Sequence, residues 1–471
     1  MLQINNKRYD LQISLFTATE KVAVGGDYDK NNAAQLVATK VEEFELHESL
    51  LTPFFTGHFT YADTQFSANL TTMLISPFLY ANITFALVKA APQEGRPEND
   101  EYNEADKFSE TVVITSVVSA PCEGSNEKMF TFSFESVDCL NFRSLLEPYS
   151  TFDKKDGLED LDKILKAVFA GAKLGEKLDL KYNVPTLKIP FLTSENATLL
   201  TSLDYIYRKT FDCNILEDNS KNAFFKIIYD HVEQKYKVWR YDSTGQNPSS
   251  ELPKPNNESA MYLKTKRAVD CDMSDGGNTM SYSTGSGRST AVPMYSGDAF
   301  SMMSFLADKT YYGYDYLKNN FEDNEKTVKE LFKNNIHEHW QSDKYRLKTL
   351  LLPDSKIDKS LKFDNCFSRF RENGSVYDVY NEMIFGTSYL HVKSDGIIGR
   401  KAGDPIYVNF VNAANSSYDR LRGDYFITDI RTRYRRRNPS EQGGATLNSY
   451  MECYSPYMMT TSNAQDGQAT F

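Results

Sequence analysis

A change of hydrophobic period within residues 375–456 is the feature that most constrains the fold of this chain. In its first part, apolar residues recur three or four positions apart, the spacing of one helix face: Val376, Val379, Tyr380, Met383 and Ile384. Ser375 and Asp378 form a start that resembles a capping box, and Gly386 supplies a left-handed stop. These signals predict a helix that ends at Gly386.

After this helix the period becomes two, which indicates β-strands. Tyr389, His391 and Ser394 precede a tight turn at residues 401–405, and residues 406–410 then alternate apolar and polar side chains. Residues 425–430 and 450–454 continue the pattern. A helix followed by four short strands favours a small antiparallel barrel.

The first 150 residues show a similar succession of strands. Leu11, Ile13 and Leu15 alternate with polar neighbours, and further strands are expected at residues 41–51, 57–66, 81–89, 111–119 and 129–137. The polar segment 91–110 is typical of an exposed loop. Six strands in a row predict an antiparallel barrel or sandwich.

Residues 151–220 return to helical periodicity. Asp156 and Glu159 are expected to start a first helix, which Gly171 ends, and Thr193 and Ser194 are expected to open a second. The two apolar stripes are Leu158, Leu161, Leu165, Val168 and Phe169 in the first helix, and Leu199, Leu200, Leu203, Ile206 and Tyr207 in the second. A short strand is expected at residues 187–191, and a hairpin of aromatic strands at 224–229 and 236–241.

The sequence therefore predicts a mainly β fold with α+β insertions, in which two small antiparallel β-barrel domains are joined by helical segments. The first barrel is expected at 1–150, the helical connector at 151–220, a discontinuous second barrel at 221–259 and 387–459, an α+β insertion at 260–386, and a flexible tail at 460–471. Within the insertion, strands are expected at 261–269 and 346–353, a helix at 324–334, and a flexible Gly/Ser-rich segment at 275–289.

Charge and cysteine content exclude several classes of protein. The chain has 53 basic and 64 acidic residues, a net charge of −11, which disfavours nonspecific nucleic-acid binding. Its 6 cysteines form no CxxC pair, so reduced, mostly buried thiols are expected. No signal peptide is expected at the start, and no apolar run is long enough to span a membrane.

Motifs for catalysis or metal binding are weak. His337 and His339 flank Glu338, but they lack a third ligand at a suitable spacing, which favours a solvated helix end or loop over a metal site. Segments 27–32 and 270–275 resemble calcium loops, but both lack the required Gly and bidentate Glu. Residues 285–290 lack the spacing and the lysine of a phosphate loop, and no nucleophile elbow occurs. We therefore expect no enzyme, no catalytic residues, no metal and no cofactor, although paired-carboxylate hydrolysis stays open.

One charged cluster is pronounced. Strand alternation places Arg431, Arg433, Arg435 and Arg437 on one face of a strand, with Thr432 on the other. One interpretation is a solvated strand end whose like charges protect a sheet edge from pairing. The sharper interpretation is an interface, in which a basic ridge pairs with acidic residues of a neighbouring subunit, because arginine suits desolvated ion pairs. No stacking aromatics of a recognised module flank the cluster, so nucleic acid is disfavoured.

Three segments resemble the central baseplate hub proteins of contractile-tailed bacteriophages, which are related to the hub part of the VgrG proteins of type VI secretion. They are an early strand (54–63), a strand and helix between the two predicted barrels (190–207), and closing strands (398–434). The insertion at 246–374 fits the pattern poorly. Unlike VgrG proteins, this chain has no following oligosaccharide-type barrel or β-helix repeats, so a spike would be a separate polypeptide.

The resemblance implies a structural protein of the virion tail baseplate, assembled in the host cytoplasm. Family members form a homotrimer whose two barrels per subunit give a pseudo-sixfold ring, and this ring adapts a hexameric tail tube to a trimeric cell-puncturing spike. The implied partners are the spike, the tail tube or tube-initiator proteins, and the surrounding wedge proteins. DNA would pass through the lumen without specific binding.

Two other classes of function are weighed against the hub. A carbohydrate-binding receptor or tail-fibre adaptor module would stack sugars on exposed aromatics such as those at 311–314, although packing is the commoner role of such rings. A cell-wall hydrolase within the insertion would degrade peptidoglycan. Obligate oligomerisation without activity distinguishes the hub from both.

Overall fold

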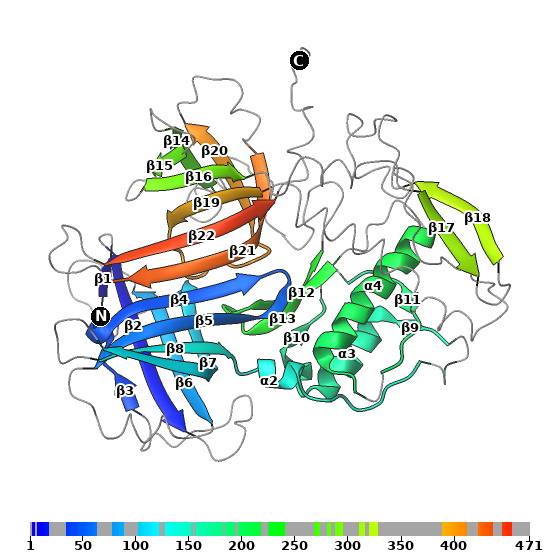
Figure 1. The fold of residues 1–471 in the computed structure, drawn as a ribbon, viewed down its shortest axis with the longest axis horizontal. Coiled ribbons are helices and arrows are strands. Elements are labelled where there is room, and N and C mark those ends of the chain that lie inside the picture. Colours follow the sequence, from blue (N-terminus) through cyan, green and yellow to red (C-terminus); the bar gives the residue numbers. More distant parts are fainter. Residues whose placement is uncertain are drawn as a thin grey trace, which may run out of the picture.

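Strand pairing dominates the structure (Figure 1). The computed structural model describes residues 2–4, 7–17, 34–63, 78–88, 102–121, 128–151, 154, 157–181, 184–193, 196–217, 225–240, 268–273, 280–283, 288–294, 310–315, 320–327, 389–411, 423–436 and 445–454. Within them, 15 strands join in one mostly antiparallel sheet, and three smaller sheets accompany it. The prediction of a mainly β fold is confirmed.

The first part of the large sheet contains all six strands predicted in the first 150 residues. Its order is β2-β6-β7-β8-β5-β4, with β1 and β3 paired to β2. The bounds are β1 (Leu2–Ile4), β2 (Lys7–Thr17), β3 (Ala34–Leu36), β4 (Val41–Ser49), β5 (Thr52–Asp63), β6 (Leu79–Val88), β7 (Tyr102–Pro121) and β8 (Lys128–Ser136). The pairings of the described strands do not close these six into a barrel, because β4 continues to β21 rather than back to β2.

The loop predicted at 91–110 is wrong from Tyr102 onward, where β7 begins. Phe108 lies opposite Phe85 on β6 and is fully buried. Asp106 and Phe108 are buried, and the residue between them is only partly buried. This alternation has the period of a strand. The polar composition of this segment masked that alternation.

Aromatic side chains form the core of this first part. The ring of Phe44 lies 5.5 Å from Phe85, 6.3 Å from Phe108 and 6.0 Å from Phe134, measured between centroids. Phe85 also packs at 6.2 Å against Tyr434, which comes from β21. Rings of this size bury about 150–250 Å² each and dominate core energetics. The core therefore includes a residue from the far end of the chain.

Strand β21 (Gly423–Arg435) joins the two halves of the large sheet. Its residues 423–426 pair with β20 (Pro405–Val411), and its residues 429–435 pair with β4. On its other side it pairs with β22 (Thr446–Tyr454) from 426 to 435. A register shift around Thr428 separates the two pairings. Such a bulge bends and twists a strand, which lets β21 serve two partners in turn.

The second part of the large sheet follows the order β21-β20-β14-β15-β16-β19-β22, and β22 pairs back to β21. Its remaining strands are β14 (Ala268–Met273), β15 (Met280–Ser283), β16 (Arg288–Met294) and β19 (Tyr389–Asp395). The strands predicted around 389, 406, 425 and 450 are all present. The β14–β20 pair is parallel, whereas its neighbours are antiparallel.

The connector carries α2 (Cys139–Phe142), β9 (Glu159–Asp160), α3 (Leu161–Gly171), β11 (Lys188–Ile189) and α4 (Leu199–Glu217). Helix α3 begins at Leu161, later than predicted, because Glu159 and Asp160 pair with β11 and Asp160 is the N-cap. It ends at Gly171 as predicted, although the left-handed residue nearby is Lys173, with φ 59°. The buried face of α3 contains the rest of the predicted stripe and adds Ile164, but Leu158 precedes the helix and is only partly buried.

The start predicted for α4 at Thr193 and Ser194 is wrong. The backbone N–H of Thr198 donates to Thr201 Oγ1 at 2.9 Å, and that of Thr201 donates to Thr198 Oγ1 at 3.2 Å. This reciprocal pair is a capping box with threonine in place of glutamate. Helix α4 therefore begins after Thr198, whereas Thr193 bonds the backbone of Tyr149.

The predicted aromatic hairpin is present as β12 (Phe225–Asp230) and β13 (Lys235–Arg240). It was expected within the second barrel, but β13 instead pairs with β10 (Leu178–Asp179), which follows the 3-10 turn η3 (Gly175–Lys177). The hairpin thus forms a separate three-stranded sheet with the connector. It lies between the large sheet and the helices (Figure 1).

Strands β17 (Thr310–Asp315) and β18 (Asn320–Thr327) form an isolated pair in the insertion. The helix predicted at 324–334 is therefore wrong for 324–327, where pairing to β17 overrides the helical pattern. Residues 270–273 belong to β14 and not to a calcium loop. Several predictions fall outside the described residues: the helix at 376–386, the strand at 346–353, most of 275–289, the histidines at 337–339, and the tail.

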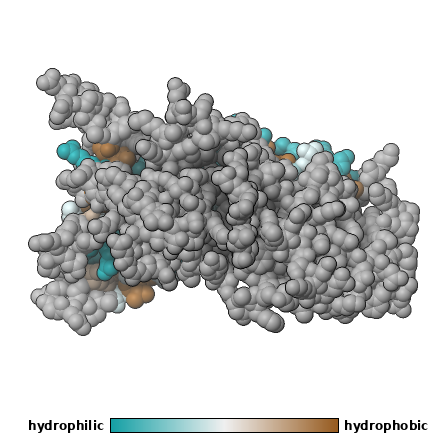
Figure 2. Space-filling view, turned by 90° about the horizontal axis from the view of Figure 1, so that it is seen from above, coloured by the Kyte–Doolittle hydropathy of each residue, from teal (hydrophilic) through white to brown (hydrophobic). Residues whose placement is uncertain are grey.

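Where described residues are visible on the face shown in Figure 2, small hydrophilic and hydrophobic groups lie near each other. The most exposed large apolar side chains of the described residues include Val118, Leu51 and Leu145. Cys139 and Cys453 are free and buried, as expected for reduced thiols. No helix in the described ranges is long and apolar enough to cross a membrane.

Candidate functional site: a buried polar junction

Loop 396–404, between β19 and β20, is the place where the two halves of the large sheet and the β12–β13 hairpin meet. The backbone N–H of Gly399 donates to Asp106 of β7 at 3.0 Å. The N–H of Gly403 donates to the carbonyl of Ile427 on β21 at 2.7 Å, and the N–H of Ile427 donates to the carbonyl of Asp404 at 3.0 Å. One short loop thus touches both halves of the sheet.

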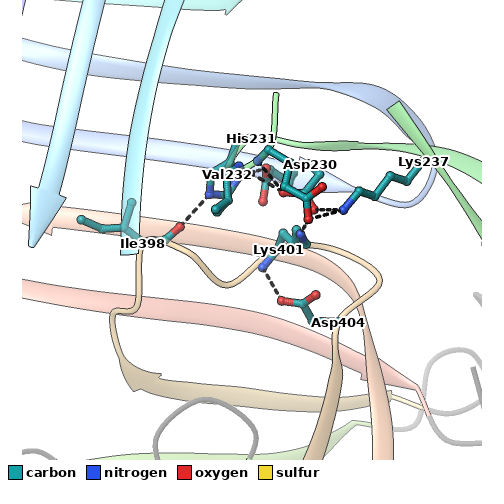
Figure 3. Close-up of polar contacts among 9 residues, drawn as sticks. Asp230, His231, Val232, Lys237, Ile398, Lys401 and Asp404 are labelled. Atoms are coloured by element: carbon teal, nitrogen blue, oxygen red, sulfur yellow. Dashed lines mark hydrogen bonds and ion pairs between the residues drawn. The ribbon is translucent and has the colours of Figure 1, made fainter. Parts of the chain in front are cut away.

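His231 holds this loop to the first half of the sheet and to the hairpin (Figure 3). Its ring is fully buried, with Nδ1 2.7 Å from Glu48 Oε1 of β4 and Nε2 2.9 Å from the carbonyl oxygen of Ile398. Burial would lower the pKa of His231, but the charge and hydrogen bond of Glu48 outweigh it and raise the pKa. The pair links three segments that are far apart in sequence.

Asp230, the neighbour of His231, fixes the other side of the loop. Its Oδ2 accepts from Lys237 Nζ at 2.9 Å and from Lys401 Nζ of the loop. Its Oδ1 accepts from the backbone N–H groups of Val232 and Glu233 at 3.1 and 3.2 Å and so shapes the hairpin turn. Burial would raise the pKa of Asp230, but the two lysines outweigh it and lower the pKa.

Turn 401–404 positions Lys401. The N–H of Lys401 donates to Asp404 Oδ2 at 3.1 Å, and burial raises the pKa of this carboxyl. Gly403 has φ 87°, in the left-handed region that favours glycine. A Cβ there would lie 2.9 Å from Trp239 Cδ1. Both the conformation and the close approach to the hairpin therefore require glycine.

A second buried cluster fastens the hairpin to β7 and the connector. Tyr229 donates to Glu110 Oε1 at 2.7 Å, and burial raises the pKa of Glu110 to about 7. Asp138 Oδ2 accepts from Tyr236 at 2.9 Å and from Lys177 at 2.7 Å. Tyr236 is fully buried between rings of the connector and the hairpin.

These groups are arranged to hold structure together. Glu48, Asp106 and Asp230 are buried, and each faces a cation or a donor at hydrogen-bond distance, while the lysines that pair with Asp230 are partly exposed. Buried charges are tolerated only when they are paired in this way, and removing one partner typically costs about 3–5 kcal/mol. The junction therefore fixes how the two halves of the sheet meet.

The predicted arginine face lies next to this junction. The side chains of Arg431, Arg433 and Arg435 point to the outer face of β21, and Thr432 and Tyr434 point inward, as predicted. Because β21 is paired on both sides there, the arginines do not protect a free edge. Arg437 lies outside the described residues.

Acidic partners of these arginines come from the same chain. Arg433 Nη2 lies 2.6 Å from Glu43 Oε1, and its Nε lies 3.7 Å from Glu45 Oε2, both on β4. Arg431 lies 3.7 Å from Asp429, which also bonds His47 at 2.6 Å. The pairs of Arg433 with Glu43 and Glu45 and of Asp429 with His47 thus join β21 to β4, whereas the Arg431–Asp429 pair lies within β21. Whether the outer side of this face contacts another subunit stays a prediction.

Glu43, Glu45 and His58 could in principle ligate a metal, because their ligand atoms lie within 4.8 Å of one another. Arg433, however, binds the Glu43 oxygen that also lies 3.3 Å from His58 Nε2. The guanidinium already supplies the positive charge that a metal would bring. The residues present do not fit a metal site.

Sequence reasoning missed the junction residues Glu48, Asp230, His231 and Lys401. A signal was present: Asp230 and His231 follow an apolar strand directly, at a turn, where two titratable side chains are uncommon without partners. The turn at 401–405 was predicted, but nothing in the sequence shows that its lysine reaches a residue 171 positions away.

Comparisons with known proteins give structural neighbours only. No family model matches the chain, and no curated protein matches it. The tail protein from Neisseria meningitidis MC58 aligns with a TM-score of 0.48 at 10% identity, covering 95% of this chain and 98% of that one. The 43 kDa tail protein of prophage MuSo2 from Shewanella oneidensis aligns with a TM-score of 0.48 at 10% identity, covering 95% and 99%.

A chain of the lidded PdpA-VgrG complex from Francisella also aligns, with a TM-score of 0.48 at 12% identity. The alignment covers 96% of this chain and 53% of that one. The neighbours are phage tail proteins and a VgrG complex.

Proposed function

We propose that this chain is a non-enzymatic structural component of a phage tail baseplate, namely a trimeric central hub between a hexameric tail tube and a trimeric cell-puncturing spike. The observation that carries the proposal is the sheet that runs without interruption from β8 through β5, β4 and β21 to β22. A part that holds two unlike assemblies in register must not bend between its ends. A hydrogen-bonded sheet clamped by buried ion pairs meets this need.

Two of the three hub-like segments lie in the halves of the sheet that the junction joins. Residues 54–63 are in β5, and residues 398–434 contain the loop, β20 and β21, whereas residues 190–207 lead into α4 of the connector. The resemblance and the joined parts therefore share these two segments. This agreement supports a role in which the relative placement of the parts matters.

The proposed hub has two small barrels per subunit. The return of β22 to β21 supports a closed second barrel, made of β21, β20, β14, β15, β16, β19 and β22. To close, the first barrel would need β2 to pair with β4. We retain the domain division 1–150, 151–220, 221–259 with 387–459, 260–386 and 460–471, with the hairpin of 221–259 reassigned to the connector.

A purely structural role is supported by the use of ionisable groups. In the junction, His231 and Lys401 are bound to the buried carboxylates of Glu48 and Asp230, so their charges are used within the fold. The proposed partners are two further copies of the chain, the spike, the tail tube or its initiator, and the surrounding wedge proteins. The proposed location is the tail baseplate of the virion, after assembly in the host cytoplasm.

The mass of the purified chain in solution tests this function first. Light scattering at two concentrations should give three times the chain mass of 53.7 kDa at both, and electron microscopy should show rings with pseudo-sixfold symmetry. Added spike protein should bind with one spike trimer per ring. A monomer that stays monomeric with the spike, or turnover of peptidoglycan by the pure chain, would contradict the proposal.

A further inference from the structure

The buried pair of His231 and Glu48 is unusual because both ring nitrogens face oxygen atoms. One nitrogen faces a carboxylate at 2.7 Å, and the other faces the backbone carbonyl of Ile398 at 2.9 Å. A carbonyl oxygen only accepts hydrogen bonds, and an ionised carboxylate also only accepts. A neutral imidazole has a single N–H and cannot donate to both. With an ionised Glu48, the geometry therefore calls for an imidazolium.

The surroundings of His231 fit a positive charge. The groups that face it are Glu48 of β4, Asp230 of β12, Glu110 of β7, and Lys401 of the loop, with the ring of Phe108 at 5.8 Å. Three of these four ionisable groups are carboxylic acids. With Lys401 already bound by Asp230, a neutral His231 would leave Glu48 as a buried charge without a cation.

We propose that loop 396–404 is a pH-controlled clasp: it stays closed while His231 carries two protons and loosens from β4 and the hairpin when one is lost. Loss of the Nε2 proton would break the bond to Ile398, and loss of the Nδ1 proton would leave Glu48 unpaired. The first loss separates the loop from the hairpin, and the second separates the hairpin, together with the loop, from β4. This inference rests on the junction geometry and not on the hub function.

The direction of the pH effect follows from proton linkage. A histidine whose pKa is raised in the folded state adds stability that is fully present below its ordinary value of about 6.5 and is lost as the pH rises through the raised pKa. Opening of the clasp should therefore become up to about tenfold more frequent per pH unit within that window, and then level off.

Side-chain nitrogen NMR of the full chain with ¹⁵N-histidine tests the protonation state directly. At pH 7, one histidine should show two protonated nitrogens, and this signal should disappear in His231→Gln. Its titration midpoint should lie above the ordinary value. A neutral tautomer at pH 7 would overturn the proposal, because the same two distances could then reflect a protonated Glu48 that donates to Nδ1.

Hydrogen exchange between pH 6 and 9 tests the release. After correction for intrinsic rates, protection of residues 396–404 should fall with pH, while protection of α3, which lies away from the clasp, should not change. Glu48→Gln should remove this pH dependence, because it removes the charge that holds the second proton. His47→Gln is the matched control, since His47 forms a half-exposed pair with Asp429 on the outer face.

The effect of Glu110 on the pH dependence must be told apart from that of His231, because the pKa of Glu110 also lies near neutrality. The pH dependence of the clasp should persist in Glu110→Gln. If it disappears there and persists in Glu48→Gln, the proposal is overturned and Glu110 controls the loop. Unchanged protection of 396–404 across the whole pH range in the natural chain would overturn it as well.

Discussion

At the junction, a single glycine determines both the backbone conformation and the packing around it. Gly403 combines φ 87° with side chains of the hairpin at close range, so that backbone shape and packing both depend on it. Gly157 has a similar φ of 65°, but a Cβ added there would meet no atom within 4 Å. Comparing substitutions at the two glycines therefore distinguishes the cost of the backbone conformation from the cost of crowding.

We expect Gly403→Ala to lower the free energy of unfolding by about 2–5 kcal/mol, since a left-handed L-residue costs about 1–2 kcal/mol and crowding adds about 1–3. Gly157→Ala should cost only about 1–2 kcal/mol, from the backbone alone. Urea unfolding followed by fluorescence measures both. Equal losses in the two variants would contradict the role given to the contact with Trp239.

Glu110 should make stability depend on pH near neutrality. Burial raises its pKa to about 7, so the folded chain holds this proton more tightly than the unfolded chain does. Stability from this group is present below about 4.5 and is lost as the pH rises through about 7. We therefore expect the stability of Glu110→Gln, measured as the urea midpoint, to increase relative to that of the natural chain as the pH rises from 5 to 8. A constant difference between the two would contradict this.

At the scale of elements, caps and bulges decide where helices and strands begin and change partners. Helix α4 starts at the reciprocal bonds of Thr198 and Thr201. Strand β21 changes from β20 to β4 at the bulge around Thr428, whose carbonyl accepts from the N–H of Leu50 at 2.8 Å. Both features are local, yet they fix how long elements are placed.

We expect Thr198→Ala to destabilise the chain by about 1 kcal/mol, the usual cost of a lost N-cap oxygen. Thr198→Ser keeps that oxygen and should stay within about 0.5 kcal/mol of the natural chain. Chemical denaturation gives both values, and circular dichroism checks the helix content. A serine variant as unstable as the alanine variant would show that the methyl group, and not the cap, is important.

Strand positions could be predicted because alternation of buried and exposed side chains depends only on the local sequence. All six strands of the first 150 residues, the aromatic hairpin and the four late strands were found in this way. Helix starts were missed where pairing to a distant strand took over, as at Glu159 and Asp160. The junction was missed because Glu48, His231 and Ile398 meet only through the tertiary fold.

At the scale of the whole molecule, the arginines of β21 can either form ion pairs within the chain or contact another subunit. Arg433 is committed to Glu43 within the chain, whereas Arg431 is 54% exposed and lies 3.7 Å from Asp429. Exposed pairs of this kind contribute at most about 1 kcal/mol to folding. Arg431 is therefore the residue of this face whose replacement best reports on contacts with another subunit.

We expect Arg431→Glu to leave the fold intact and to weaken the proposed trimer at least about tenfold, or about 1.4 kcal/mol. Arg143→Glu is the control, since Arg143 is 52% exposed and paired with Glu135 on the first half of the sheet. A light-scattering dilution series at low and high salt measures both. An oligomer unchanged by Arg431→Glu at both salt concentrations would exclude this face as an interface.

The pairing of β4 with β21 also imposes a delay during synthesis. His47 and Asp429, which meet across this pair, are 382 positions apart. A ribosome adds about 5–20 residues per second, so the edge of β4 waits on the order of tens of seconds for its partner strand. Throughout that time Glu43 and Glu45 keep the edge charged, which discourages pairing with another nascent chain. The same carboxylates that bind Arg433 in the finished protein thus guard the unfinished one.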